Sequence, residues 1–417
     1  MPTSDHDLTT LRRLAEEQAE IAALPVHKET INNWRRLNGL ERVKPMVWVN
    51  EICWHEMNYE DELTLRCEDE FCRRLETQFR HTLYQWRHLP GDMIVEPVIY
   101  CPLVIHDTGF GIQEDVDVVR TDDDSSIVSR DFRPQIDSLE DVAKIQFPEV
   151  RLDEEASDRD FSRMSEIFEG ILPVVQLGLT GAWFAPWDEL IRWWDVQKAM
   201  LDLVLRPELV HAAMERLVSA YIHRLDQWEA LGLLSSNNGN WRIGSGGLGH
   251  TDELPPADYC SPTPPSAKQL WGCATAQIFS DVSPAMHEEF ALQYERRWLR
   301  RWGLTYYGCC EPLHNKMDIL RSIPNLRKVS MSPWADPEKG AEELGNKYVF
   351  SHKPNPAILA DPVWNPDLAR RRYREILEKT QGCCVEIILK DISTVRYEPQ
   401  RLWSWTQIAS EEAERFA

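Results

Sequence analysis

The stretch LTYYGCCEPLHNKMDILRSIPNLRKVSM, residues 304–331, contains two strand patterns separated by a short helical pattern. Residues 304–309 and 326–331 are short apolar runs, and residues 313–322 have helical spacing. A strand, a helix and a second strand in this order are typical of two parallel strands joined by a crossover helix. The stretch therefore favours an α/β fold with a parallel sheet.

The same alternation continues through most of the chain. Short apolar runs occur at residues 46–52, 93–100, 172–178, 232–238, 304–309, 326–331, 348–351 and 385–389. Helical patterns follow most of them, at residues 60–88, 188–231, 284–302, 313–322, 336–345 and 366–381. Eight such units predict a closed (β/α)8 TIM barrel. A doubly wound open sheet is the alternative, but no glycine-rich GxGxxG turn supports it.

The predicted barrel has an N-terminal addition and two long loops. Residues 1–45 are expected to form a helical arm, divided at Pro25, and residues 46–417 the barrel itself. The segments 101–165, after the second strand, and 239–274, after the fourth, are too long for ordinary connections. Long loops at this end of a barrel often form substrate walls or lids, although packing or dimer contacts would explain them equally well.

Composition excludes some partners. The net charge of -22 over 417 residues disfavours nucleic acid, because such a surface repels phosphate backbones. We expect no membrane span, since no apolar run approaches the required length, and no signal peptide at the polar N-terminus. A cytoplasmic protein with free thiols among its ten cysteines is therefore predicted.

Barrel enzymes carry their catalytic groups at the carboxyl ends of the strands, and this rule selects the candidates. A histidine beside a carboxylate suits proton transfer, a carboxylate within an apolar run needs a partner or a ligand, and a lysine can hold an anion. The predicted catalytic residues are His55, Glu56, Glu96, His352 and Lys353. Each also has a structural explanation, such as a packed histidine or an internal ion pair.

Other strand ends carry aromatic and short polar side chains. Aromatic residues suit the wall of an apolar pocket, and clustered amides or a carboxylate suit hydrogen bonds to a ligand. The predicted substrate-binding residues are Trp183, Trp187, Asn237, Asn238, Tyr307 and Asp391. Core packing, a tight turn and a Lys390–Asp391 ion pair are the alternatives for these positions.

The fifth predicted strand ends in a thiol-rich segment. Cys309, Cys310 and Glu311 offer soft sulfur ligands and a carboxylate within three residues, which suits zinc. Burial of the cysteines as small residues, without metal, is the alternative. The second adjacent pair, Cys383-Cys384, precedes the last strand and is interpreted as structural.

These segments resemble the uroporphyrinogen decarboxylase superfamily. Residues 307–311 are similar to the His-x-Cys-Gly strand end of its zinc-dependent methyltransferases, which places Cys309 on the family cysteine. Residues 350–356 resemble the family turn Gly-Asn-x-Asp-Pro, and residues 279–284 the segment after its fourth strand. The resemblance covers residues 46–410. It implies the barrel fold, a possible homodimer, and either methyl transfer or decarboxylation.

The sequence also departs from the family. The Arg-Gln-Ala-Gly-Arg motif that holds porphyrinogen carboxylates is absent, since residues 52–58 read ICWHEMN. Tyr307 stands where the methyltransferases have a zinc-binding histidine, and Lys390-Asp391 where they have a second cysteine. Substitute ligands would be Cys310, Glu311, His55 or His352. No corrinoid-binding Asp-x-His-x-x-Gly segment is present, so a corrinoid would have to arrive on a partner protein.

Three hypotheses follow. The first is a metal-dependent methyltransferase or demethylase, with zinc near Cys309, that moves a methyl group between a small methylated substrate and a corrinoid or thiol. The second is a cofactor-free decarboxylase, or lyase, acting on a small carboxylated substrate, in which Lys353 and His352 hold and protonate a carbanion. The third is a barrel that binds a ligand or partner without catalysis.

Overall fold

The computed structural model describes residues 3–119, 129–256 and 263–416. The acidic residues 121–124 of the predicted loop 101–165 lie outside these residues, as does part of the proline-rich stretch 255–265 of the predicted loop 239–274.

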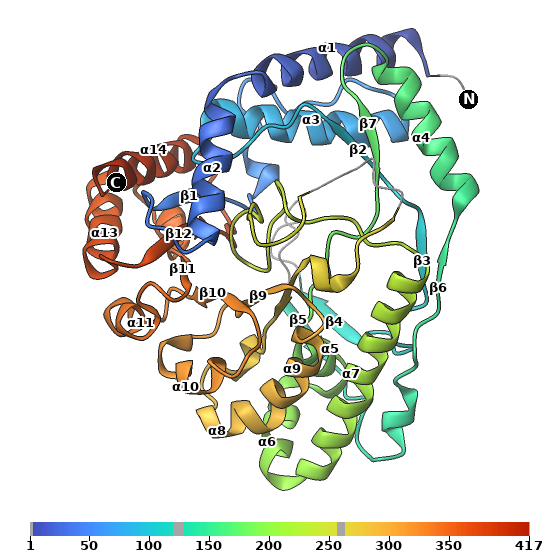
Figure 1. Cartoon of the computed structure of the whole chain (residues 1–417), viewed down its shortest axis with the longest axis vertical. Coiled ribbons are helices and arrows are strands. Elements are labelled where there is room, and N and C mark those ends of the chain that lie inside the picture. Colours follow the sequence, from blue (N-terminus) through green and yellow to red (C-terminus); the bar gives the residue numbers. More distant parts are fainter. Residues whose placement is uncertain (1–2, 120–128, 257–262, 417) are drawn as a thin grey trace.

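Helices and strands alternate along most of the chain (Figure 1). The helices are α1 (Asp5–Ala22), α2 (Val26–Asn38), α3 (Glu70–His88), α4 (Glu154–Phe168), α5 (Pro186–Trp194), α6 (Val196–Leu205), α7 (Pro207–Ala230), α8 (Pro284–His287), α9 (Gln293–Leu299), α10 (Met317–Leu320), α11 (Pro337–Leu344), α12 (Ala357–Ala360), α13 (Pro366–Lys379) and α14 (Gln400–Arg415). The strands are β1 (Met46–Val49), β2 (Ile99–Pro102), β3 (Ile105–Asp107), β4 (Val116–Val119), β5 (Ser129–Phe132), β6 (Val150–Leu152), β7 (Val174–Leu177), β8 (Trp271–Ala274), β9 (Leu304–Tyr307), β10 (Leu326–Met331), β11 (Val349–His352) and β12 (Cys384–Leu389). None of the helices within the described ranges combines the length and the apolar character that crossing a membrane requires.

The main sheet has six parallel strands in the order β1-β12-β11-β10-β9-β8. β2 and β7 form a separate parallel pair, which runs beside α3 and α4 in Figure 1. A parallel bridge between Leu179 and Leu234 extends this pair. The predicted α/β class with a parallel sheet is therefore confirmed, while the pairing among the described residues leaves β1 and β8 as sheet edges.

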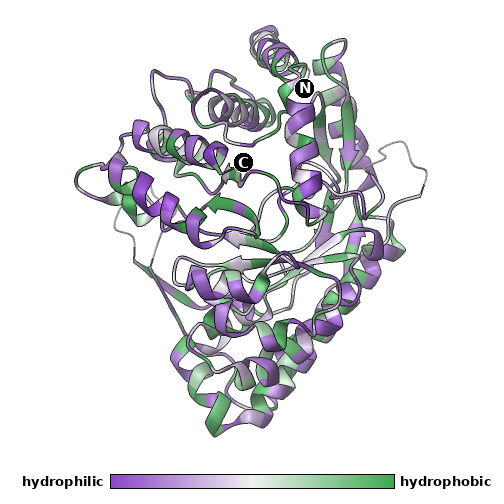
Figure 2. Ribbon diagram, turned by 60° about the vertical axis from the view of Figure 1, so that its left-hand side comes forward, coloured by the Kyte–Doolittle hydropathy of each residue, from purple (hydrophilic) through white to green (hydrophobic). Residues whose placement is uncertain are grey.

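The two faces of the main sheet bury different side chains. Val385, Ile387 and Leu389 of β12 belong to the large core shared with the surrounding helices. In Figure 2 much of the central sheet is green or white and the surrounding helices carry both purple and green residues, as expected when helices cover a buried sheet. Glu386 lies on the opposite face of β12, where it pairs with Lys328 of β10 at 2.9 Å, and both side chains are fully buried.

The glycine-rich part of the predicted 239–274 loop packs over this inner face. A Cβ on Gly246 would lie 2.5 Å from a Glu386 carboxylate oxygen, and one on Gly247 would lie 2.4 Å from the Trp34 ring. The Gly247 N–H donates to Glu386 at 3.1 Å. Glycine is required here because the backbone approaches the sheet too closely for any side chain. This part of the loop fills the inside of the fold.

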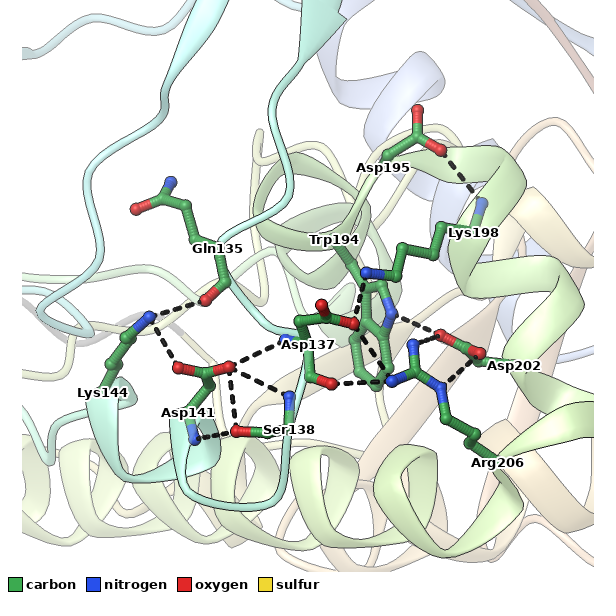
Figure 3. Close-up of polar contacts among 10 residues, drawn as sticks. All are labelled: Gln135, Asp137, Ser138, Asp141, Lys144, Trp194, Asp195, Lys198, Asp202 and Arg206. Atoms are coloured by element: carbon green, nitrogen blue, oxygen red, sulfur yellow. Dashed lines mark hydrogen bonds and ion pairs between the residues drawn. The ribbon is translucent and has the colours of Figure 1, made fainter.

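The other long loop packs against helices. Between β2 and α4 the chain forms two antiparallel pairs, β3–β6 and β4–β5. Figure 3 shows how the connection after β5 is fixed: the Asp137 carboxylate binds Lys198 at 2.5 Å and Arg206 at 3.1 Å, both near or within α6. Its residues Leu103 and Val104 line the larger cavity described below, and none of its described residues lines the smaller one, so the loop both packs against helices and contributes to a cavity wall.

Several elements differ from those predicted. The helical pattern 188–231 is three helices, because Asp195 adopts a positive φ of 72° and Pro207 starts the next helix. The run 93–100 forms a strand only from Ile99, and the run 232–238 forms a single bridge. β8 was not predicted at all. It contains Gly272. A Cβ at this position would lie 2.2 Å from the Trp302 ring, so only glycine leaves room for that side chain.

Candidate functional site

A cavity of about 420 Å³ opens where the chain leaves several parallel strands. Its lining residues follow β1, β7, β8, β9 and β12 or come from the glycine-rich loop: Glu51, Trp183, Arg242, Gly244, Gln277, Cys309, Cys310, Lys390 and Asp391. The carboxyl ends of parallel strands are the usual place for ligand sites in α/β proteins. We therefore take this space, called here the thiol cavity, as the candidate active site.

Two adjacent thiols form part of its wall. The Sγ atoms of Cys309 and Cys310 lie 3.5 Å apart, with Cys309 buried and Cys310 half-buried. The Lys390 ammonium lies 3.9 Å from the Cys309 sulfur. The hydrogen bond from the Cys309 thiol lowers the pKa of Cys310; burial opposes this shift and the Lys390 charge supports it. The same hydrogen bond, together with burial, raises the pKa of Cys309. The pair can thus hold one negative charge, best exposed on Cys310.

Charged side chains of both signs surround the thiols. Lys390 contacts the Asp391 carboxylate and lies 3.3 Å from Glu51, which also binds Arg242 at 2.6 Å. Burial alone would raise the pKa of Glu51, but hydrogen bonds and the two cations outweigh it and lower that pKa to about 2. Burial and a hydrogen bond with Glu51 raise the pKa of Asp391. The predicted Lys390–Asp391 ion pair is confirmed.

Two of these residues have strained backbones. Glu51 and Asp391 have φ angles of 50° and 55°, in the left-handed region that residues other than glycine seldom adopt. The Asp391 N–H donates to the Glu51 carboxylate at 3.2 Å, so the two strained turns support one another. Such conformations concentrate at functional sites, where they aim side chains that a relaxed turn would not.

Glu311 lies behind the thiols, and its carboxylate already has hydrogen-bond partners within the protein. Its carboxylate accepts hydrogen bonds from the Thr275 hydroxyl at 2.9 Å and the Cys309 N–H at 2.8 Å. Among residues 3–119, 129–256 and 263–416, no three His, Cys, Asp or Glu side chains are grouped as metal ligands. Two sulfurs are fewer than the three protein ligands of a catalytic zinc site. The described residues therefore do not make up a zinc site by themselves.

Tyr307 points away from the thiol cavity. Its hydroxyl donates to Glu295 at 2.6 Å and lies 2.6 Å from the His287 ring, on the helix-facing side of β9. His287 in turn lies 3.1 Å from Lys316. The second carboxylate oxygen of Glu295 is buried without a hydrogen-bond partner among the described residues. Burial raises the pKa of Glu295 to about 8.

His352, the last residue of β11, and Lys353, which follows the strand, point to opposite sides of the sheet. The His352 ring packs against Phe350 on the helix side, with ring centroids 6.3 Å apart, and burial lowers its pKa to about 3. Lys353 points inward, contacts the Tyr306 hydroxyl and donates to the Ser351 hydroxyl at 2.6 Å. Burial lowers the pKa of Lys353 to about 7, although Glu386 and Cys309 favour its charged form. Lys353 therefore lies within electrostatic reach of Cys309, although neither it nor His352 lines the thiol cavity.

His55 and Glu56 form a short helical turn after β1. The buried Glu56 carboxylate accepts hydrogen bonds from the Thr394 hydroxyl at 2.6 Å and the N–H groups of Val395 and Tyr397 at 2.6 and 3.1 Å. It thereby fixes the segment that follows β12. The His55 ring lies 3.7 Å from Glu56, but neither residue lines the thiol cavity.

Three more candidates serve the framework. The Trp187 indole is fully buried and donates to the Phe290 carbonyl at 3.0 Å. The Asn237 amide binds both the N–H and the carbonyl of Trp271, at 2.9 Å each, and so stands in for a strand neighbour of β8. The Asn238 amide donates to the Thr251 and Leu254 carbonyls at 2.9 Å.

Glu96 belongs to a second, larger cavity of about 700 Å³. This space lies between α3 and β2, and the Asn240-Trp241 segment closes one side. The two cavities share no lining residue, although Trp241 and Arg242 are neighbours in the chain. Of the residues predicted for one site, the structure brings together Trp183, Cys309, Cys310 and Asp391.

Sequence reasoning missed Glu51, Arg242 and Gln277. Glu51 carried a usable signal, since it is the first acidic residue after the apolar run of β1. No such signal marks Arg242 in the sequence, because the path of a glycine-rich loop depends on what the loop packs against.

Comparisons with known proteins add little. No family model matches the sequence, and no curated protein matches it. Among solved structures, a methyltransferase from Methanosarcina mazei is similar at a TM-score of 0.49 and 12% identity, over 92% of this chain and 98% of that one. A likeness this weak carries no functional argument.

Proposed function

We propose that this protein is an enzyme that transfers methyl groups in the thiol cavity. The observation that supports this proposal is the Cys309–Cys310 pair beside Lys390, at the carboxyl ends of parallel strands. A thiolate is a strong nucleophile toward an activated methyl carbon, and a neighbouring cation and thiol hydrogen bond favour the thiolate at neutral pH. A small methylated compound is the proposed substrate.

The proposed step balances within the cavity. The Cys310 thiolate attacks the methyl carbon, a sulfur–carbon bond forms, and the bond from that carbon to the leaving heteroatom breaks. The electron pair stays on the heteroatom, which takes a proton from solvent, while the Lys390 ammonium keeps its pairing with the Asp391 carboxylate. The methyl group then passes to an acceptor, a thiol or a corrinoid carried by a partner protein.

Zinc and the corrinoid partner remain proposals that the family resemblance implies. Cys309 and Cys310 would hold the metal, and bound zinc would polarise the substrate heteroatom. Because Glu311 is engaged by Thr275 and the Cys309 N–H, a third protein ligand would have to come from elsewhere. No step above depends on a metal.

We also propose that the strands close into a (β/α)8 barrel and that the protein forms a homodimer. Eight parallel strands, β1, β2, β7 and β8 to β12, follow one another in chain order, and the Leu234 bridge and the Asn237 amide connect β7 to β8. At the remaining seam, Asp92 binds the Val47 N–H through its carboxylate and the Val47 carbonyl through its N–H, both at 2.7 Å.

The test uses the whole protein and a panel of methylated ethers, amines and thioethers. Without an acceptor, peptide mass spectrometry should find a methyl group on Cys310, none in Cys310→Ser and less in Cys309→Ser; Cys383→Ser is the control. A reduced corrinoid partner should then gain the methyl group, which changes the cobalt absorbance. Zinc measured on the same preparations tests the metal proposal, which expects its loss in both site variants.

The alternative is a cofactor-free decarboxylase, and the inward position of Lys353 near the thiols favours it. Carbon dioxide release from a carboxylated substrate, abolished by Lys353→Met, with no methyl group found on Cys310 or cobalt, would replace our proposal by this alternative.

A further inference from the structure

We propose that the 700 Å³ cavity between α3 and β2 binds an organic cation, at a site separate from the thiol cavity. Its volume lies within the range of small-molecule sites. Its wall is mostly apolar and includes several aromatic side chains, namely Trp48, Phe71, Phe79, Tyr100 and Trp241.

The wall of this cavity carries a carboxylate that no cation of the wall neutralises. Four acidic or basic side chains line the cavity: Arg74, His81, Glu96 and Asp160. The Arg74 guanidinium is largely exposed and lies 3.5 Å from Glu70, one helical turn away. The His81 ring stacks on Trp54 with centroids 3.8 Å apart, and burial lowers its pKa to about 4, so that it is neutral at pH 7. Neither the Arg74 nor the His81 side chain therefore neutralises a carboxylate inside the cavity.

Glu96 is that carboxylate. Its side chain accepts a hydrogen bond from the Tyr100 hydroxyl at 2.9 Å, and within the described parts of the chain no lysine, arginine or histidine nitrogen forms an ion pair with it. The Gln18 amide holds the Glu96 and Val98 carbonyls at 3.0 and 3.3 Å, which fixes the backbone that carries the acid. A half-buried carboxylate without a cation is unfavourable, and a cationic ligand would remove that cost.

Aromatic rings stand beside this carboxylate. The Tyr100 and Trp241 rings lie 4.9 Å apart at an angle of 54° and form a corner, with Tyr100 bonded directly to Glu96. The faces of aromatic rings attract cations, and the attraction grows when water is excluded. A carboxylate combined with aromatic faces therefore favours an alkylated ammonium group over a neutral apolar ligand. The overall charge of -22 also draws cations toward the surface.

The proposal does not depend on methyl transfer, and its test measures binding alone. Choline serves as the probe, and 3,3-dimethylbutan-1-ol is its uncharged analogue of the same shape. Calorimetry should show choline binding at least tenfold more tightly than the analogue. Glu96→Gln should weaken choline binding at least tenfold and leave analogue binding unchanged.

A matched control lies just outside the cavity. Asp158 is an exposed carboxylate of α4 that does not line it, so Asp158→Asn should change choline affinity less than threefold. Thermal unfolding of each variant establishes that it is folded. Equal binding of choline and the analogue, unchanged choline affinity in Glu96→Gln, or no choline binding at all would overturn the proposal.

Discussion

Lys390 is the residue on which the chemistry of the thiol cavity depends most. Its buried ammonium contacts Asp391, lies 3.3 Å from Glu51 and lies 3.9 Å from the Cys309 sulfur. A cation at such a distance lowers the pKa of a neighbouring acid by about one to three units. Lys390 therefore lies between the thiol pair and the two carboxylates of the cavity, Glu51 and Asp391.

Replacing Lys390 should make the thiol pair less reactive at neutral pH. Without the ammonium, the thiolate loses its cation and the pKa of Cys310 rises. In Lys390→Met, the pH midpoint of Cys310 labelling by iodoacetamide should move up by about one unit. Lys347→Met, which removes an exposed lysine, is the control and should leave the midpoint unchanged. An unchanged midpoint in folded Lys390→Met would show that Lys390 does not act on the thiols.

Individual strands show which boundaries a sequence pattern predicts correctly and which it does not. The β10 prediction matches the structure at both ends, and β12 differs by one residue, because continuous apolar runs fix buried parallel strands. β2 begins six residues later than predicted, at Ile99 instead of Met93. Met93, Ile94 and Val95 are buried without forming a strand, and the exposed Pro97 has no N–H to donate to a neighbouring strand. β8 escaped prediction because Gly272 interrupts its apolar pattern.

The residues of the candidate site were predicted correctly where the strands before them were. Cys309, Cys310 and Asp391 directly follow strands that the sequence places correctly, so the rule of strand ends located them. The same rule cannot tell on which side of a strand a residue points. Tyr307 and His352 were therefore included, although both face the helices. The position of Arg242 depends on how the glycine-rich loop packs in the folded protein, so it could not be predicted from the sequence.

Gly272 offers a test of β8. A Cβ there would lie 2.2 Å from the fully buried Trp302 ring, which cannot withdraw from the core. Overpacking of this kind costs about 1–3 kcal/mol or more. Gly272→Ala should lower the free energy of unfolding by at least that range in urea denaturation. Gly39→Ala, where the added Cβ meets only ordinary contacts at 3.4 Å, should change it little. Equal stability of both variants would contradict the observed packing of Trp302 on β8.

At the scale of the whole molecule, the framework buries ionisable groups on both sides of the main sheet. Lys328 and Glu386 neutralise one another on the inner side, at 2.9 Å. On the helix side, Glu295 lies beside Tyr307, and its second oxygen lacks a partner among the described residues. Glu295 is thus a buried acid whose ionisation the fold opposes.

Stability should therefore depend on pH through Glu295. Burial raises its pKa in the folded state to about 8, from an ordinary value near 4.5. Between these values the folded state holds a proton that the unfolded state has lost, so the contribution of Glu295 to the free energy of unfolding falls as pH rises. Glu295→Gln, which keeps the hydrogen bond from Tyr307 and cannot ionise, should gain stability relative to the wild type as pH increases from 4.5 to 8.

The comparison between variant and wild type isolates this residue. Lys353 and His352 also titrate with shifted pKa values, but they are present in both proteins, and their effects cancel in the difference. Urea denaturation at several pH values measures the difference directly, and Glu338→Gln on the exposed side of α11 is the control. A difference that stays constant from pH 4.5 to pH 8 would mean that Glu295 ionises in the folded state as freely as in the unfolded chain, and that its burial beside Tyr307 is relieved by a partner such as water or Lys316.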